Sequence, residues 1–280
     1  MEVIESPLEM QKLSLSLKRA GKKIGFVPTM GYLHEGHLSL VRRAKQENDV
    51  VVVSIFVNPL QFGKNEDLDR YPRDFERDCS LCEREKVDYI FYPSASDMYP
   101  EDFKTYVEVK DLPDVLCGKF RPGHFRGVTT VVLKLFNIVQ PDNAYFGEKD
   151  YQQLKIIQRM VKDLNVPVNV IGCPIVREPD GLAMSSRNKY LSEEERKSAV
   201  FISKALFQVK ETFERGERDV NKLKDMGINI LKQAPLIREI QYFEVVHPES
   251  LEPKEIAESS DVVAVAVYIG NTRLIDNIRL

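Results

Sequence analysis

A run of eight residues, Val50 to Val57, is β-branched or otherwise apolar at every position except Ser54. A strand with one solvated face alternates apolar and polar residues, whereas a strand covered on both faces is apolar throughout. The run therefore predicts a strand in the interior of a parallel sheet that is covered by helices on both sides.

Strand-like and helix-like segments alternate around this run. Apolar residues at helical spacing predict helices at Leu8–Arg19, around Leu38–Ala44, and at Pro72–Lys86, Gly127–Val139 and Tyr151–Leu164. Short apolar segments predict further strands at Ile24–Val27, Asp88–Tyr92, Ala144–Phe146 and Val168–Ile171. Such alternation is typical of βαβ units in a doubly wound α/β sheet, whose ligands bind at the carboxyl ends of the strands.

The pattern changes after Arg177. Ser192 with Glu195 three positions later is a capping box that opens a long helix. The expected elements are helices at 192–215 and 220–233 and strands at 241–246, 262–269 and 273–278, with a hairpin turn at Gly270-Asn271. Two domains are therefore predicted, a Rossmann-like domain over residues 1–176 and a smaller α+β domain over residues 177–280.

Composition excludes several classes of protein. The 40 Lys and Arg residues against 43 Asp and Glu give a net charge of −3, which does not favour nucleic-acid binding. No apolar run approaches the roughly 20 residues that span a bilayer, and residues 1–12 lack the pattern of a signal peptide. Four cysteines in 280 residues are no disulfide framework, so a cytoplasmic location is expected.

The cysteines are also poor candidates for a metal site. Phe75, Cys79 and Cys82 recur at the i, i+4, i+7 spacing of a core-facing helix stripe. A single CxxC pair without a second pair does not indicate zinc. No residue is predicted to be a metal ligand.

The segment Phe26–Leu38 joins the first core strand to the next helix. Gly31 and Gly36 have the spacing of a P-loop, but His37-Leu38 replaces its Lys-Ser/Thr pair. What remains is H-x-G-H at a helix start, where backbone N–H groups, the helix dipole and two imidazoles can all bind phosphate. Two solvated histidines, or a two-histidine metal site without a visible third ligand, are the alternatives.

Three further polar segments lie at expected strand ends or at the domain junction. Asp180–Asn188 has consecutive hydroxyls followed by a guanidinium, and these groups can bind a polyphosphate. The segment can also be an ordinary polar linker. Phe146–Gln153 has a glycine that allows close backbone approach and a lysine that could bind phosphate, at the start of a helix. Alternatively, its acidic residues only interact favourably with the positive end of the helix dipole. Val57–Phe62 has amides that can orient a hydroxy acid or cap a turn.

Together these motifs resemble the pantoate–β-alanine ligase family of the HxGH nucleotidyltransferase-like superfamily. The matching segments are Pro28–His37, Val57–Phe62, Pro122–Val128, Phe146–Gln153 and Gly181–Asn188, in this order. H-x-G-H alone would indicate only the superfamily, whereas five motifs at compatible spacing are specific. The match runs through nearly all of residues 20–190, and the region beyond Tyr190 is assigned by length and position.

The resemblance implies an ATP-dependent condensation of pantoate with β-alanine, giving pantothenate, AMP and pyrophosphate through pantoyl adenylate. Magnesium is expected with ATP, because the metal bridges its phosphates. The resemblance also implies a homodimer. We expect the small domain to act as a lid that keeps water from the adenylate.

The resemblance also implies roles for individual residues. Charge neutralisation at the phosphates is expected from His34, His37, Lys149, Ser185, Ser186 and Arg187. The ATP site is expected to include Met30, Gly31, Tyr32, Leu33, His34, Glu35, Gly36, His37, Gly147, Glu148, Lys149, Asp150, Val176, Met184, Ser185, Ser186 and Arg187. Pantoate is assigned to Gln61 and Gln153, and β-alanine also to Gln61, with Arg121 and His124 as further candidates. His37 could act as an acid or base, or only stabilise phosphate.

Other functions remain as alternatives. A sibling adenylyl transferase would stop at the adenylated product, and a tRNA-synthetase fragment is disfavoured by the short, acidic chain. A regulatory nucleotide-binding module needs affinity but not every transition-state contact, so the intact set of polar residues speaks against it. A purely structural Rossmann-like domain leaves the clustered polar loops unexplained.

Overall fold

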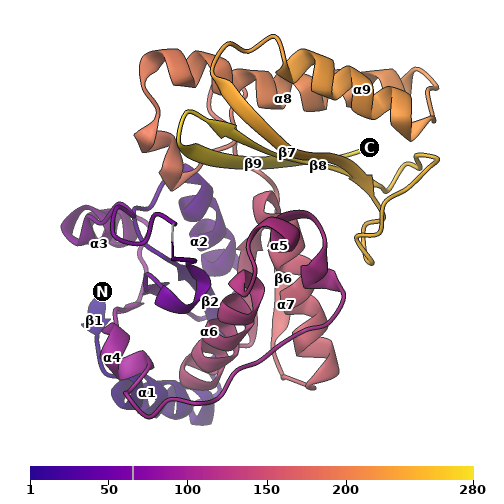
Figure 1. The fold of residues 1–280 in the computed structure, drawn as a ribbon. Helices are drawn as coiled ribbons and strands as arrows, with labels where there is room; N and C mark the ends of the chain where they lie inside the picture. Colours follow the sequence, from indigo (N-terminus) through magenta and orange to yellow (C-terminus); the bar gives the residue numbers. More distant parts are fainter. Residues whose placement is uncertain (65) are drawn as a thin grey trace. The chain divides into compact units, whose positions relative to one another are not determined.

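The computed structural model describes residues 1–64 and 66–280. These residues form two compact units (Figure 1). Unit 1 comprises Met1–Lys110, Arg121–Glu148 and Gln153–Pro174, and unit 2 comprises Asp111–Phe120, Lys149–Gln152 and Ile175–Leu280. The domain boundary after residue 176 and the lid role of the C-terminal domain remain predictions.

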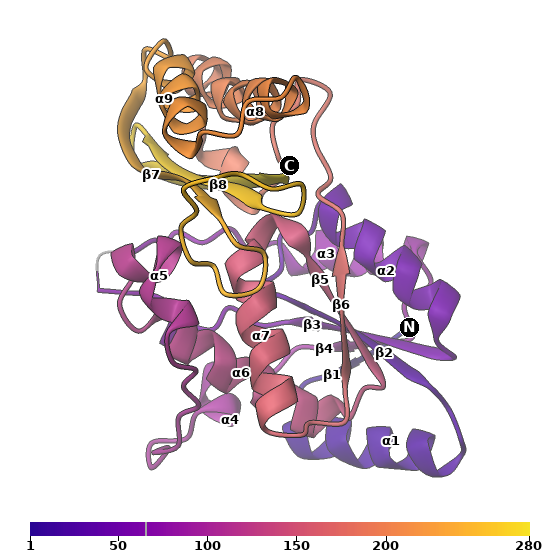
Figure 2. The same ribbon diagram turned by 90° about the vertical axis from the view of Figure 1, so that its right-hand side faces the viewer.

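Unit 1 is built on a six-stranded sheet in which every pair of strands is parallel (Figure 2). Its strands are β1 (Glu2–Ile4), β2 (Ile24–Thr29), β3 (Val50–Ile55), β4 (Tyr89–Phe91), β5 (Asn143–Gly147) and β6 (Asn169–Cys173), in the order β1-β4-β3-β2-β5-β6. All six residues of β3 are buried, as the unbroken apolar run predicts. The predicted α/β class with a doubly wound parallel sheet is therefore confirmed.

Helices cover both faces of this sheet. They are α1 (Pro7–Arg19), α2 (Glu35–Glu47), α3 (Phe75–Arg84), α4 (Ala95–Met98), α6 (His124–Val139) and α7 (Tyr151–Asp163), with short 3₁₀ turns η1 (Pro59–Gln61) and η3 (Glu148–Asp150). On one face, Val41 of α2 and Cys82 of α3 share a core with Val53 of β3. On the other face, the ring of Phe136 in α6 meets that of Phe26 in β2 at 6.4 Å.

The strand order reverses between β2 and β5. From β2 the chain continues to β3 and β4 on one side, and it later returns to β5 and β6 on the other. The crevice outside the carboxyl ends at such a reversal is where doubly wound sheets bind their ligands. The H-x-G-H turn follows β2, and the Gly147–Asp150 segment begins at the last residue of β5.

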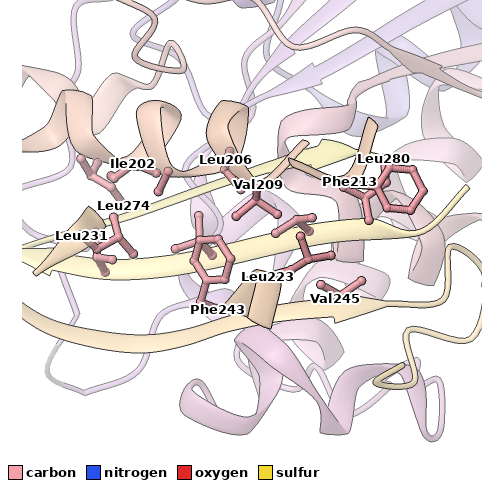
Figure 3. Packing of buried hydrophobic residues seen from close by; sticks show 14 of the residues in the cluster. Ile202, Leu206, Val209, Phe213, Leu223, Leu231, Phe243, Val245, Leu274 and Leu280 are labelled. Carbon is pink, nitrogen blue, oxygen red and sulfur yellow. The ribbon is translucent and has the colours of Figure 1, made fainter. Parts of the chain in front are cut away.

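Unit 2 contains an antiparallel sheet, β7 (Ile237–Val246), β8 (Val262–Ile269) and β9 (Thr272–Arg279), in that order. Its helices and 3₁₀ turns are η2 (Leu112–Asp114), α5 (Leu116–Phe120), η4 (Ser186–Tyr190), α8 (Glu193–Glu214) and α9 (Val220–Leu231). Residues such as Leu206 of α8, Leu223 of α9 and Phe243 of β7 form its core (Figure 3). The predicted capping box of α8 is present, with reciprocal bonds between Ser192 and Glu195.

Some elements differ from the expected ones. The strand β1 was not predicted, because three residues carry no readable period, and α6 begins at His124 rather than at Gly127. The strand β7 begins four residues before the expected Gln241. Within the described residues, no helix is both long enough and apolar enough to cross a membrane.

Candidate active site

The turn after β2 is held by Thr29. Its hydroxyl donates to the Ser54 carbonyl at 2.7 Å and accepts the Gly31 N–H at 3.1 Å. Gly31 and Tyr32 then adopt left-handed backbone conformations, with φ of +80° and +51°. Two consecutive residues in this region reverse the chain sharply, so that α2 starts close to the end of the strand.

The two histidines of the H-x-G-H motif share one end of α2. His34 is the N-cap of this helix, and its Nδ1 accepts the Gly36 N–H at 3.1 Å. Nδ1 of His37 accepts the His34 N–H at 3.3 Å, and the ring centroids lie 4.1 Å apart. Because Nδ1 is an acceptor in both rings, the proton of each neutral imidazole is on Nε2. Each ring thus presents an N–H donor at the positive end of a helix.

Gln61 lies on the η1 turn after β3. Its Nε2 is 3.4 Å from Sδ of Met30, and its Oε1 accepts from Asn58 Nδ2 at 3.0 Å. Asn58 is buried and makes its other bonds to the Gly127 carbonyl, the Tyr99 hydroxyl and the turn itself. Of the two amides that could meet a hydroxy acid, Asn58 therefore holds the turn, and Gln61 is placed beside Met30.

Gly127 brings α6 against this turn. A Cβ at position 127 would lie 2.3 Å from the Leu60 carbonyl oxygen, which is backbone and cannot rotate away. We expect Gly127→Ala to lower the free energy of unfolding by about 1–3 kcal/mol through overpacking and to raise the KM for pantoate. Thermal unfolding and steady-state kinetics measure both. Gly63→Ala is the matched control, since its nearest contact would be an ordinary 3.6 Å; an equal effect of both variants would contradict this role.

Arg121 and His124 act on the backbone of Gln61. Arg121 pairs with Glu66 through Nε at 2.7 Å, and its Nη1 lies 3.0 Å from Nε2 of His124. Since a guanidinium can only donate, Nε2 accepts and the His124 Nδ1–H donates to the Gln61 carbonyl at 2.8 Å. Burial tends to raise the pKa of the Glu66 carboxyl, but the hydrogen bond and charge of Arg121 lower it below its usual range. These further candidates thus position Gln61.

In unit 2, adjacent side chains of β9 hold two of the predicted ATP-binding segments. Asn277 donates from Nδ2 to the Lys149 carbonyl at 2.9 Å. The Asp276 carboxylate accepts hydrogen bonds from both terminal nitrogens of Arg177, at 2.6 and 3.0 Å. Arg177 also donates to the Gly181 carbonyl at 3.0 Å. The Asp276 carboxyl is buried, which raises its pKa, while Arg177 opposes that shift.

The segment from Val176 to Arg187 is a tight hairpin followed by η4. The Met184 N–H donates to the Val176 carbonyl at 3.0 Å, so these two predicted residues are neighbours. The Ser185 hydroxyl accepts the Arg187 N–H at 3.3 Å and thereby caps η4, and Ser186 is buried. The structure therefore gathers Val176 and Met184–Arg187 in one place.

Three further predicted residues, Gln153, Glu35 and Asp150, lie on α7, α2 and η3. Gln153, on the first turn of α7, is half-buried, while its neighbour Gln152 is buried and bonded to the backbone of Leu112, Val115 and Cys117. The Glu35 carboxylate is paired with Arg42. Asp150 lies 4.0 Å from the Lys149 ammonium.

Comparison with known proteins identifies the family. The family model described as pantoate-beta-alanine ligase matches residues 2–279. A pantothenate synthetase of Sulfurihydrogenibium sp. (strain YO3AOP1) is 70% identical over 278 residues, which are 99% of both chains. The crystal structure of pantothenate synthetase from Thermus thermophilus has a TM-score of 0.95 at 48% identity, covering 100% of this chain and 99% of that one.

A third relative carries ligands. Pantoate-beta-alanine ligase from Francisella tularensis was solved in complex with beta-gamma ATP and beta-alanine. It is 38% identical, with a TM-score of 0.82 over 100% of this chain and 97% of that one. This chain therefore belongs to the pantoate-beta-alanine ligase family and is a ligase that forms the amide bond of pantothenate in an ATP-dependent reaction.

Proposed function

We propose that the condensation proceeds in two steps through pantoyl adenylate, with the H-x-G-H turn at the first step. The observation that carries this proposal is the orientation of His34 and His37, whose Nε2–H groups supply donors beside a helix N-terminus at the strand reversal. Preorganised donors of this kind stabilise charge that develops during phosphoryl chemistry.

In the first step a carboxylate oxygen of pantoate attacks the α-phosphorus of ATP. A new P–O bond forms, the bond between the α-phosphorus and the bridging oxygen breaks, and pyrophosphate leaves with the electron pair. We assign stabilisation of the phosphate charge to the imidazoles of His34 and His37, the Lys149 ammonium, the hydroxyls of Ser185 and Ser186, and the Arg187 guanidinium. The wider ATP site is assigned to residues 30–37, 147–150, 176 and 184–187.

In the second step the amine of β-alanine attacks the acyl carbon of the adenylate. The amide C–N bond forms, the bond between the acyl carbon and the AMP oxygen breaks, AMP leaves with the electron pair, and the proton lost from the amine passes to solvent directly or through a base. We also assign to His37 a part in this proton transfer, beside phosphate binding, because imidazoles exchange protons near neutral pH. Beta-alanine and beta-gamma ATP are the compounds bound in the Francisella relative.

Pantoate is assigned to Gln61 and Gln153, and β-alanine also to Gln61. The Gln61 amide is fixed by Asn58 and lies beside Met30, so its loss should weaken pantoate binding directly. We expect Gln61→Ala to raise the KM for pantoate about tenfold or more, as for a lost polar contact. Initial rates at varied pantoate measure this, and a change confined to the KM for ATP would contradict the assignment.

Magnesium is proposed to enter with ATP, held by its phosphates. Residues 1–64 and 66–280 contain no group of three or more His, Cys, Asp or Glu side chains that could hold a metal ion, so no protein ligand is assigned to it. We also propose a homodimer and a cytoplasmic location. The location agrees with four cysteines that are all free thiols.

The adenylation step is tested by pantoate-dependent exchange of labelled pyrophosphate into ATP, without β-alanine. A two-step ligase exchanges label only when pantoate is present. No exchange in an otherwise active enzyme would contradict a reversible adenylate and favour direct condensation.

A further inference from the structure

A buried carboxylate on α3 accepts hydrogen bonds from the backbone of the turn that leads into the H-x-G-H motif. Asp78 is 1% exposed. Its Oδ2 accepts the Tyr32 N–H and its Oδ1 accepts the Leu33 N–H, both at 2.7 Å. Both oxygens are therefore committed to two consecutive backbone groups that directly precede His34.

The turn needs such support because its backbone conformation is strained. Tyr32 has φ of +51°, a conformation that residues with a side chain rarely adopt, and it follows Gly31 at +80°. A pocket of about 390 Å³ borders the turn, with Gly31 and Asp78 among its lining residues. The two hydrogen bonds to Asp78 offset a backbone conformation that is unfavourable on its own.

A second residue of α3, Arg77, also contacts this turn. Arg77 donates from Nη1 to the Leu33 carbonyl at 2.9 Å, and its guanidinium lies over the Tyr32 ring at 5.1 Å from the centroid. The two residues of α3 thus bind both backbone N–H groups and one carbonyl of Tyr32-Leu33.

A buried carboxylate is costly to the fold, and apolar residues in its place are often more stable. The surroundings show this cost, since burial raises the pKa of the Asp78 carboxyl despite its bonds to Leu33 and Tyr32 and the nearby charge of Arg77. A group that is unfavourable for stability and aimed at a strained turn before a catalytic motif is best explained by positioning.

We propose that Asp78 is a positioning residue that fixes the direction of His34 and His37 toward the nucleotide phosphates, with Arg77 as its partner. This inference rests on the proposed function of those histidines. Asp78 itself touches no substrate in this scheme and acts through the backbone of Tyr32 and Leu33.

The test is Asp78→Asn in the full chain, assayed by ATP–pyrophosphate exchange well below the melting temperatures of both proteins. An asparagine would aim an N–H at one of the two backbone N–H groups. We expect kcat to fall about 10- to 100-fold and the KM for ATP to rise, while the KM for pantoate changes by less than about twofold.

Asp74→Asn is the matched control, because it removes the same charge from the start of the same helix and keeps an oxygen for the Arg77 N–H. It should leave the kinetics unchanged. Arg77→Met, at a partly exposed position, is a second variant that does not empty a buried site. It should lower kcat about 3- to 10-fold, as for one lost hydrogen bond.

The melting temperature and the kinetics together distinguish a structural carboxylate from a positioning one. If Asp78→Asn and Arg77→Met lower only the melting temperature and leave kcat and the KM for ATP unchanged, the carboxylate is structural and the inference is overturned. The wild-type exchange measured alongside tests the proposed function separately, because its absence would remove the role of the histidines whatever the variants do.

Discussion

His37→Ala and Lys149→Ala should each lower the rate of adenylation by about two to three orders of magnitude, the range for a lost electrostatic donor in an active site. His37 presents its Nε2–H beside the N-terminus of α2, and Lys149 has its backbone fixed by Asn277 and a largely covered side chain. Because these donors act on charge that grows in the transition state, the loss should fall on kcat more than on the KM for ATP. Single-turnover formation of pyrophosphate measures it.

His247→Ala is the matched control for the histidine. Nδ1 of His247 also accepts backbone N–H groups, from Glu249 and Ser250, but it closes a turn outside the motif. Its replacement should leave the adenylation rate unchanged. A near-normal rate in His37→Ala or in Lys149→Ala would remove that residue from the catalytic set.

Arg177→Met should lower the free energy of unfolding by about 3–5 kcal/mol, because it leaves a buried carboxylate without its cation. Asp276 is 3% exposed and receives two hydrogen bonds from Arg177, which also ties down the Gly181 carbonyl. The hairpin that carries Met184 to Arg187 should loosen at the same time, raising the KM for ATP. Chemical unfolding and steady-state kinetics measure the two effects.

Two further variants distinguish the loss of any arginine ion pair from the cost of leaving a buried carboxylate without its cation. Arg196→Met breaks an exposed pair with Asp180 and should cost less than about 1 kcal/mol. The double variant Arg177→Met/Asp276→Leu removes both buried charges and should recover much of the lost stability. If Arg177→Met is no more destabilising than Arg196→Met, the buried pair does not hold the hairpin.

The sheet of unit 1 could be predicted because burial on both faces leaves a direct mark on the sequence. The Val50–Val57 run indicates a central strand without reference to any other element, and β3 is buried throughout. The strand β1 leaves no such mark. Its three residues pair with β4 only because the tertiary fold places them there, so no local pattern could reveal it.

The polar segments could be singled out from the sequence because their chemistry is unusual at a strand end, but the residues whose side chains hold these segments could not. Asp78 is 46 positions away from Tyr32 along the chain. A signal was nevertheless present, since Asp78 falls at i+3 of the stripe formed by Phe75, Cys79 and Cys82. A carboxylate within a core-facing stripe needs a buried partner.

Unit 2 contains a second buried carboxylate of this kind. Asp276 alternates with Thr272 and Leu274, which are buried positions of β9, so a carboxylate there also required a partner. The sequence showed the need but not the identity of that partner, because Arg177 is 99 positions away and is brought close only by folding. Spacing therefore singles out the segments, and long-range contacts determine how they are held in the structure.

The central claim is tested most directly by measuring AMP and pyrophosphate release from the purified chain with ATP, magnesium and pantoate, with and without β-alanine. A two-step ligase gives both products over many turnovers only when β-alanine is present. Continued pyrophosphate release without β-alanine and without AMP would instead indicate a sibling adenylyl transferase, and binding of ATP without turnover would indicate a regulatory module.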